Sequence, residues 1–201
     1  VSAPAALIGG ILSLAVGLHG FRQNVFFKDM PAVGNSFRNH EMLLAWIGVL
    51  VVTVVINLIL LTRGAHQKGQ PVITAGLSTA LRGLVPPMLT GGVLGGCLIW
   101  FDENIVIGAI TWILCYGLAL QATVNFAPRS IIWLARAFII TGQSLVIVYF
   151  AMNGLGMFQR KEAPASLFLA LTFGLYHVIY AAAVFFSNPE PTSEQSVCET
   201  P

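Results

Sequence analysis

Long apolar runs with no polar face dominate the pattern of hydrophobic and polar positions along this chain. Six stretches are each long enough to cross the ~30 Å hydrocarbon core of a bilayer, which takes ~20 helical residues. Five of them cover about 5–26, 42–62, 105–126, 131–154 and 165–187. The remaining one, third along the chain, ends at residue 101 and begins somewhere between residues 72 and 83. Strands of a membrane barrel alternate apolar and polar residues, and these runs do not. We therefore predict an all-α fold, a polytopic membrane protein with a bundle of about six transmembrane helices.

Short polar turns separate several of the predicted spans. The acidic turn at 102–104 predicts a tight hairpin between the third and fourth spans. Pro128 is suited to the start of the fifth span, because proline is tolerated in the first turn of a helix. The polar segment 188–201 has almost no apolar content, which predicts a disordered tail. We expect a single six-helix transmembrane domain over residues 1–187.

The composition indicates lipid rather than water as the solvent. Only 9% of the residues are charged and 56% are hydrophobic, whereas soluble domains carry roughly 25% charged residues. A net charge of +2 without a basic cluster argues against nucleic acid as a partner. Cys97, Cys115 and Cys198 show no paired spacing, so we expect neither a disulfide framework nor a metal site. The expected partners are the lipid bilayer and other membrane subunits, in a homo-oligomer or a larger complex.

The distribution of Lys and Arg among the loops gives only a weak preference for one orientation of the chain in the membrane. With the N-terminus inside, five Lys or Arg residues fall on each side of the membrane. The short turns break this tie, because the turn at 102–104 carries no cation and the turn before the fifth span carries Arg129. We expect both termini on the inner side of a bacterial inner membrane.

Ionisable and polar residues within the spans are the candidates for a binding site, because such groups are costly in a bilayer. Arg82 lies one turn before Pro86 and Pro87, which remove backbone donors and bend a helix. One interpretation is a hydrated kink where Arg82 holds an anion; the other is an arginine that snorkels to the interface. The candidate substrate-binding residues are Arg82, Tyr176, Tyr180 and Gln143.

His19 and His177 are a second candidate site, for a cofactor. Each lies inside an apolar run, in the first and the last predicted span. Neutral imidazoles on two facing helices are a common way to ligate haem in a membrane bundle. Counting inward at 1.5 Å per residue puts the two rings within about two turns in depth. The pair predicts either haem b ligation or ordinary hydrogen bonds between helices; His40 and His66 are assigned to loops.

Small and aromatic residues in the spans predict packing and anchoring. Gly91, Gly92, Gly95 and Gly96 form two overlapping small-xxx-small pairs, which let helix backbones approach closely in lipid. We expect these pairs to pack within the bundle or in a homodimer. The four tryptophans lie mostly toward the span ends, as interfacial anchors do.

The motifs and acidic residues that the spans lack limit the possible functions more than any motif that is present. No span contains Asp or Glu, and the chain has no HExxH, GxSxG or Walker motif. We therefore expect no catalytic residues and a non-enzymatic role: permeation of a small solute or anion, sensing, or service as an accessory membrane subunit. The alternative is a redox anchor that binds haem b or quinone between the first and last spans.

Overall fold

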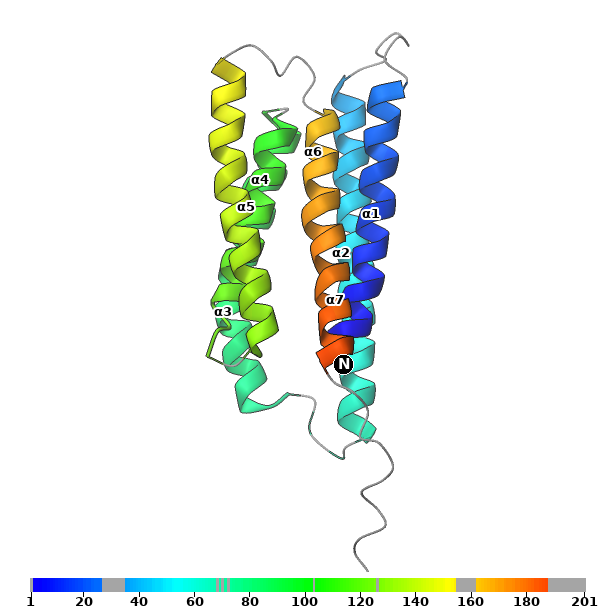
Figure 1. Cartoon of the computed structure of the whole chain (residues 1–201), viewed down its shortest axis with the longest axis vertical. Coiled ribbons are helices and arrows are strands. Elements are labelled where there is room, and N and C mark those ends of the chain that lie inside the picture. Colours follow the sequence, from blue (N-terminus) through cyan, green and yellow to red (C-terminus); the bar gives the residue numbers. More distant parts are fainter. Residues whose placement is uncertain are drawn as a thin grey trace, which may run out of the picture.

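The computed structural model of the chain describes residues 2–26, 35–67, 69, 71, 73–102, 104–125, 127–154 and 162–187. These residues form an all-α bundle without strands, which confirms the predicted fold class (Figure 1). The helices are α1 (Ser2–Phe26), α2 (Asn35–Gln67), α3 (Ala75–Trp100), α4 (Ile105–Gln121), α5 (Arg129–Gly154) and a last rod of α6 (Glu162–Leu169), the π-helical η1 (Ala170–Leu175) and α7 (Tyr176–Ser187). His40 and His66 lie within α2 rather than in loops, because that helix extends beyond its apolar run at both ends.

The helices suit a membrane by length and composition. Five of the described helices are long and apolar enough to span a bilayer, and α4 is a shorter apolar helix of 17 residues. On α2, large side chains such as Val51, Val55 and Leu58 are about half exposed, and an apolar surface of this kind matches a hydrocarbon solvent. α4 lies between α3, α5 and α6, where protein rather than lipid covers most of it.

The helices form two groups that stand side by side in Figure 1. One group contains α3, α4 and α5, and the other contains α1, α2 and the α6–η1–α7 rod. Helices within a group pack extensively, while α2 and α3 touch only sparingly across the boundary. The boundary between the two groups is therefore the place where a site within the membrane can form.

Close backbone approach holds α1 against the rod. A Cβ atom at Gly17 would lie 2.5 Å from the Cβ of Ala170, and one at Gly10 would lie 3.0 Å from the carbonyl oxygen of Gly174. Residues four apart drift around an α-helix by about 40° per step. The wider turn of η1 reduces this drift, so Ser166, Ala170 and Gly174 all stay on the side that faces α1.

The four glycines of α3 divide into two pairs with different surroundings. A Cβ at Gly91 would clash with Cys115 of α4, and one at Gly95 would clash with the indole of Trp112. A Cβ at Gly92 or Gly96 would meet nothing within 4 Å. Only the first pair packs within the described bundle, because adjacent pairs on one helix point about 100° apart.

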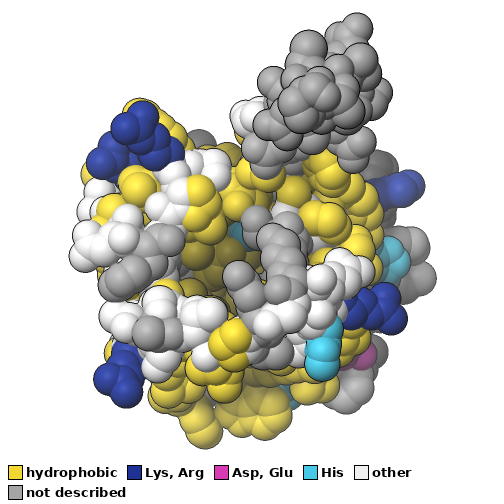
Figure 2. Space-filling model, turned by 90° about the horizontal axis from the view of Figure 1, so that it is seen from below, with side chains coloured by type: hydrophobic (Ala, Val, Ile, Leu, Met, Phe, Trp, Pro, Cys, Tyr) yellow, Lys and Arg dark blue, Asp and Glu magenta, His cyan; other side chains and the backbone are white. Residues whose placement is uncertain are grey.

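Both ends of the described chain lie at one end of the bundle, where α1 begins and α7 ends (Figure 1). Arg63, Arg82 and Arg129 belong to helix ends on this side, and their side chains are exposed. Figure 2 looks at this end and shows Lys and Arg side chains spread around its rim. The predicted disordered tail, 188–201, lies outside the described residues, as do several cations of the opposite end. The orientation therefore stays a prediction.

The two shortest turns test the topology. In a background without the natural cysteines, Asn104→Cys and Ser130→Cys should be labelled from opposite sides of the membrane, because the two positions cap opposite ends of the bundle. With both termini inside, an impermeant maleimide added to intact cells should label the Asn104→Cys variant only. Labelling of Ser130→Cys alone would invert the orientation, and labelling of both would contradict the bundle.

The adjacent glycines of α3 test the packing. Gly95→Val should destabilise the protein by about 2 kcal/mol, because the added methyls meet Trp112 in a filled contact. Gly96→Val should change stability by less than about 0.5 kcal/mol, because its side chain enters open space. Thermal unfolding in detergent measures both, and equal losses would show that α3 and α4 do not meet in this register.

Candidate functional site

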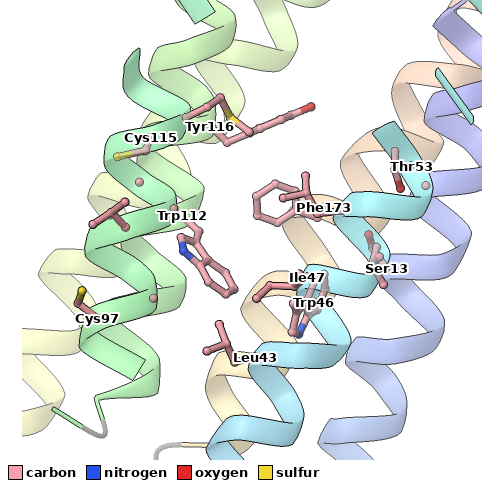
Figure 3. Close-up of a pocket in the computed structure, with 18 of the residues that line it drawn as sticks. Ser13, Leu43, Trp46, Ile47, Thr53, Cys97, Trp112, Cys115, Tyr116 and Phe173 are labelled. Atoms are coloured by element: carbon pink, nitrogen blue, oxygen red, sulfur yellow. The ribbon is translucent and has the colours of Figure 1, made fainter. Parts of the chain in front are cut away.

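A cavity of about 710 Å³ lies between the two groups of helices (Figure 3). α2 and α3 line most of it, and α1, α4 and the rod close the back. Along α2 it runs from Leu43 to Thr53, which is about 15 Å at 1.5 Å per residue. Its main aromatic and polar lining residues are Ser13, Trp46, Thr53, Trp100, Trp112, Tyr116, Phe173 and His177. Among the described residues, no charged side chain lines it.

The cavity opens sideways, between α2 and α3. Several of its lining residues on these two helices are exposed, with Ile47 at 43% and Val93 at 63%. The lining residues of α1 at the back, such as Ser13, are buried. At the end of the cavity near Leu43 and Cys97, the rings of His40 on α2 and Trp100 on α3 stack with centroids 3.9 Å apart. A molecule dissolved in the surrounding lipid therefore has a direct path into the cavity.

A hydrogen bond joins the two groups of helices at one end of the cavity. The hydroxyl of Tyr116 on α4 and Nε2 of His177 on α7 lie 2.8 Å apart. One helical turn before His177, the ring of Phe173 lies parallel to the imidazole, with centroids 6.3 Å apart. Figure 3 shows Tyr116 and Thr53 at this end of the cavity and Leu43 and Cys97 at the other. The polar groups of the site are thus gathered at the end nearer the middle of the bundle.

Phe138 of α5 is the buried centre of the contacts around this hydrogen bond. Its ring meets the edges of Tyr116 at 4.8 Å, Phe173 at 5.2 Å and His177 at 5.7 Å between centroids. Such tilted arrangements place positive ring edges against negative ring faces. A second hydrogen bond across the boundary, 2.7 Å from the Thr141 hydroxyl to the Tyr176 hydroxyl, lies beside the cluster. The aromatic cluster fixes the position of His177.

Three residues that line the cavity carry a buried polar atom without a hydrogen-bond partner among the described residues: Thr53 (Oγ1), Trp112 (Nε1) and His177 (Nδ1). An unpaired buried polar group costs roughly 1–3 kcal/mol. The Trp112 nitrogen packs against Gly95 of α3, and the Thr53 hydroxyl packs against Gly9 of α1, so neither atom faces the cavity. Nδ1 of His177 is likewise enclosed by protein.

The structure does not bring His19 and His177 together. His19 is exposed on α1, near the level at which Gly20 packs on Ser166. Ser166 precedes His177 by eleven residues, which separates the two imidazoles in depth by about 16 Å. The sequence count assumed that the inner ends of the two spans lie at one level, whereas the contacts of Gly10 with Gly174 and of Gly20 with Ser166 shift α1 along the rod. His177 lines the cavity and His19 does not.

The predicted substrate-binding residues lie on three different helices, α3, α5 and α7, and outside the cavity lining. Arg82 is exposed in a shallow hollow on α3, and α3 continues as a helix through Pro86 and Pro87. Gln143 is exposed on α5. Tyr176 is held by Thr141 beside the aromatic cluster, and Tyr180 is buried. Of the six predicted site residues, the cavity includes only His177.

The sequence did not identify several of the residues that line the cavity. Tyr116 lies in an apolar run with no polar neighbour on its face, and only its pairing with His177 across the boundary marks it. Trp46 and Trp112, expected as interfacial anchors, form walls of the cavity instead. The one available signal was Gly92 and Gly96, whose pairing predicted a close contact that the described bundle leaves unfilled.

Comparison with known proteins adds no family to this description. No family model, curated protein or solved structure matches the chain. Within the described residues, no group of three His, Cys, Asp or Glu side chains is placed to hold a metal ion. The chemistry of the cavity is therefore the basis on which a function can be inferred.

Double-mutant analysis tests the hydrogen bond across the boundary. Tyr116→Phe and His177→Phe should each destabilise the protein, and the double variant should lose less than the sum. We expect a coupling free energy of about 0.6–1.7 kcal/mol, the range for hydrogen bonds between membrane helices. Thermal unfolding of the four proteins in detergent measures it. Strict additivity would mean that the two side chains do not interact.

Proposed function

We propose that this protein is a non-enzymatic membrane component that binds a small lipid-soluble molecule within the bilayer, as a sensor or accessory subunit. The observation that carries the proposal is the cavity of about 710 Å³ that opens between α2 and α3. Ligand pockets commonly measure ~300–1,000 Å³ and have mostly apolar walls with a few placed polar groups. This cavity has that size and that distribution of chemistry.

The lining indicates a neutral ligand. A charged molecule would leave hydrocarbon-like surroundings for a cavity whose described lining offers no counter-charge. Entry from the side also favours a molecule that already partitions into lipid. Sensing or accessory binding needs no path through the protein, so a cavity at one depth is sufficient for it.

Permeation of an anion has less support than ligand binding. The cation proposed for it, Arg82, is exposed on the outer surface of α3 rather than in the cavity. This position matches the snorkelling interpretation. A haem held by His19 and His177 has no shared site in the described geometry, because only one of the two histidines reaches the cavity.

Filling the cavity tests the proposal. A brominated octylbenzene should quench tryptophan fluorescence saturably in the purified protein, because Trp46 and Trp112 line the cavity and a bromine atom quenches on contact. Gly92→Leu with Gly96→Leu should weaken this binding at least about tenfold, because both side chains would enter the cavity.

Gly48→Leu provides the matched control. Its added side chain also meets nothing within 4 Å, but the position does not line the cavity. Binding should stay unchanged in this variant. Quenching that never saturates, or that is the same in the filled variant and the parent, would show simple partitioning into the detergent and would overturn the proposed function.

A further inference from the structure

We infer that the occupant of the cavity is a neutral ring compound with a hydroxyl group, of the phenol or hydroquinone class, and that its hydroxyl donates a hydrogen bond to Tyr116. This inference rests on the proposed function and names the chemistry that the site selects. It follows from three features of the cavity: its opening toward lipid, the proton arrangement at its polar end and its aromatic walls.

Apolar contact alone gives such a cavity no selectivity. A ligand that arrives from hydrocarbon exchanges one apolar surrounding for another, so the hydrophobic effect contributes little to its binding. Polar groups and ring contacts then decide which molecule stays. In this cavity the polar groups lie at the end formed by Thr53, Tyr116 and His177.

The surroundings of His177 assign its proton. Nε2 lies 2.8 Å from the Tyr116 hydroxyl, and Nδ1 has no hydrogen-bond partner among the described residues. A phenol hydroxyl is a stronger donor than an imidazole N–H, and an imidazole nitrogen is a stronger acceptor than a phenol oxygen, so we assign the proton of the neutral ring to Nδ1. Nε2 is then the acceptor, and Tyr116 donates its proton to it.

This arrangement leaves the oxygen of Tyr116 as an acceptor with no proton to give. The group it can receive from the cavity is a donor, and a ligand hydroxyl is the neutral donor that a lipid-soluble molecule carries most readily. Thr53 lies at the same end of the cavity, but its hydroxyl packs against Gly9 of α1, so Tyr116 is the partner that this end offers to the ligand.

The walls of the cavity suit a ring. Trp46 and Trp112 extend into it from α2 and α4, and Phe173 extends from the rod (Figure 3). Aromatic side chains favour offset or edge-on contact with another ring, which adds to the burial of area. A flexible acyl chain would fill the apolar end but would leave the polar end without a partner.

The test compares a bromophenol that carries an octyl chain with its methyl ether, which has nearly the same shape but no donor. The protein is the full chain with Trp100→Phe and Trp133→Phe, so that Trp46 and Trp112 report binding. Both probes should quench saturably, and the phenol should bind about fivefold more tightly, the effect of one hydrogen bond.

Two variants test whether Tyr116 causes the preference for the phenol. Tyr116→Phe should bring the affinities for the phenol and the ether together. Tyr149→Phe, which removes a hydroxyl bonded to Asn104 outside the cavity, should leave the fivefold difference in place. If Tyr116→Phe does not fold, His177→Phe should still reduce the difference, because the proton of Tyr116 is then free to be donated to the oxygen of either probe.

The remaining outcomes of the binding test would overturn either this inference alone or the proposed function as well. Equal saturable binding of phenol and ether to the parent protein would overturn this inference and leave the proposed function standing. No saturable quenching by either probe would overturn both. Strong quenching by brominated acyl chains in phospholipid vesicles, undiminished when the phenol is added, would identify a lipid chain as the occupant and overturn the inference.

Discussion

Close backbone contact at small residues is the constraint on which this bundle depends. Lipid is as apolar as the side chains, so helices gain little by burying leucine or valine and are held instead by short-range packing. Gly10 and Gly17 bring α1 against the rod, and Gly91 and Gly95 bring α3 against α4. Each group of three helices is stable through contacts of this kind, and the boundary between the groups has fewer of them.

The boundary is held by a different kind of contact. Tyr116 and His177 share a hydrogen bond across it, and the ring of Phe138 packs on both. α4 also packs on α6 across the boundary, so the two groups separate only on the side of α2 and α3, which touch sparingly. The cavity is the space that this separation leaves, with the stack of His40 on Trp100 at its far end.

The sequence was sufficient for the fold and insufficient for the site. Apolar runs near the length of a bilayer identified the six helical segments, because a spanning backbone has to satisfy its own hydrogen bonds. The site depends on which faces meet across the boundary, and runs that are apolar on every side carry no such signal. His177 was found because an imidazole in an apolar run stands out, whereas its partner Tyr116 does not. The register of the rod also depends on η1, whose extra width per turn has no marker in ALTFGL.

The sideways opening between α2 and α3 has a consequence for the ligand binding that we propose. For a molecule that enters from lipid, the fraction of cavities that are occupied depends on the mole fraction of that molecule in the membrane. Its concentration in water matters only because it sets this mole fraction through partitioning. Lipophiles that partition strongly are enriched in the bilayer by orders of magnitude, so even a modest affinity for the cavity gives high occupancy at trace aqueous levels. A change in membrane composition would then alter the state of the protein without any change outside it.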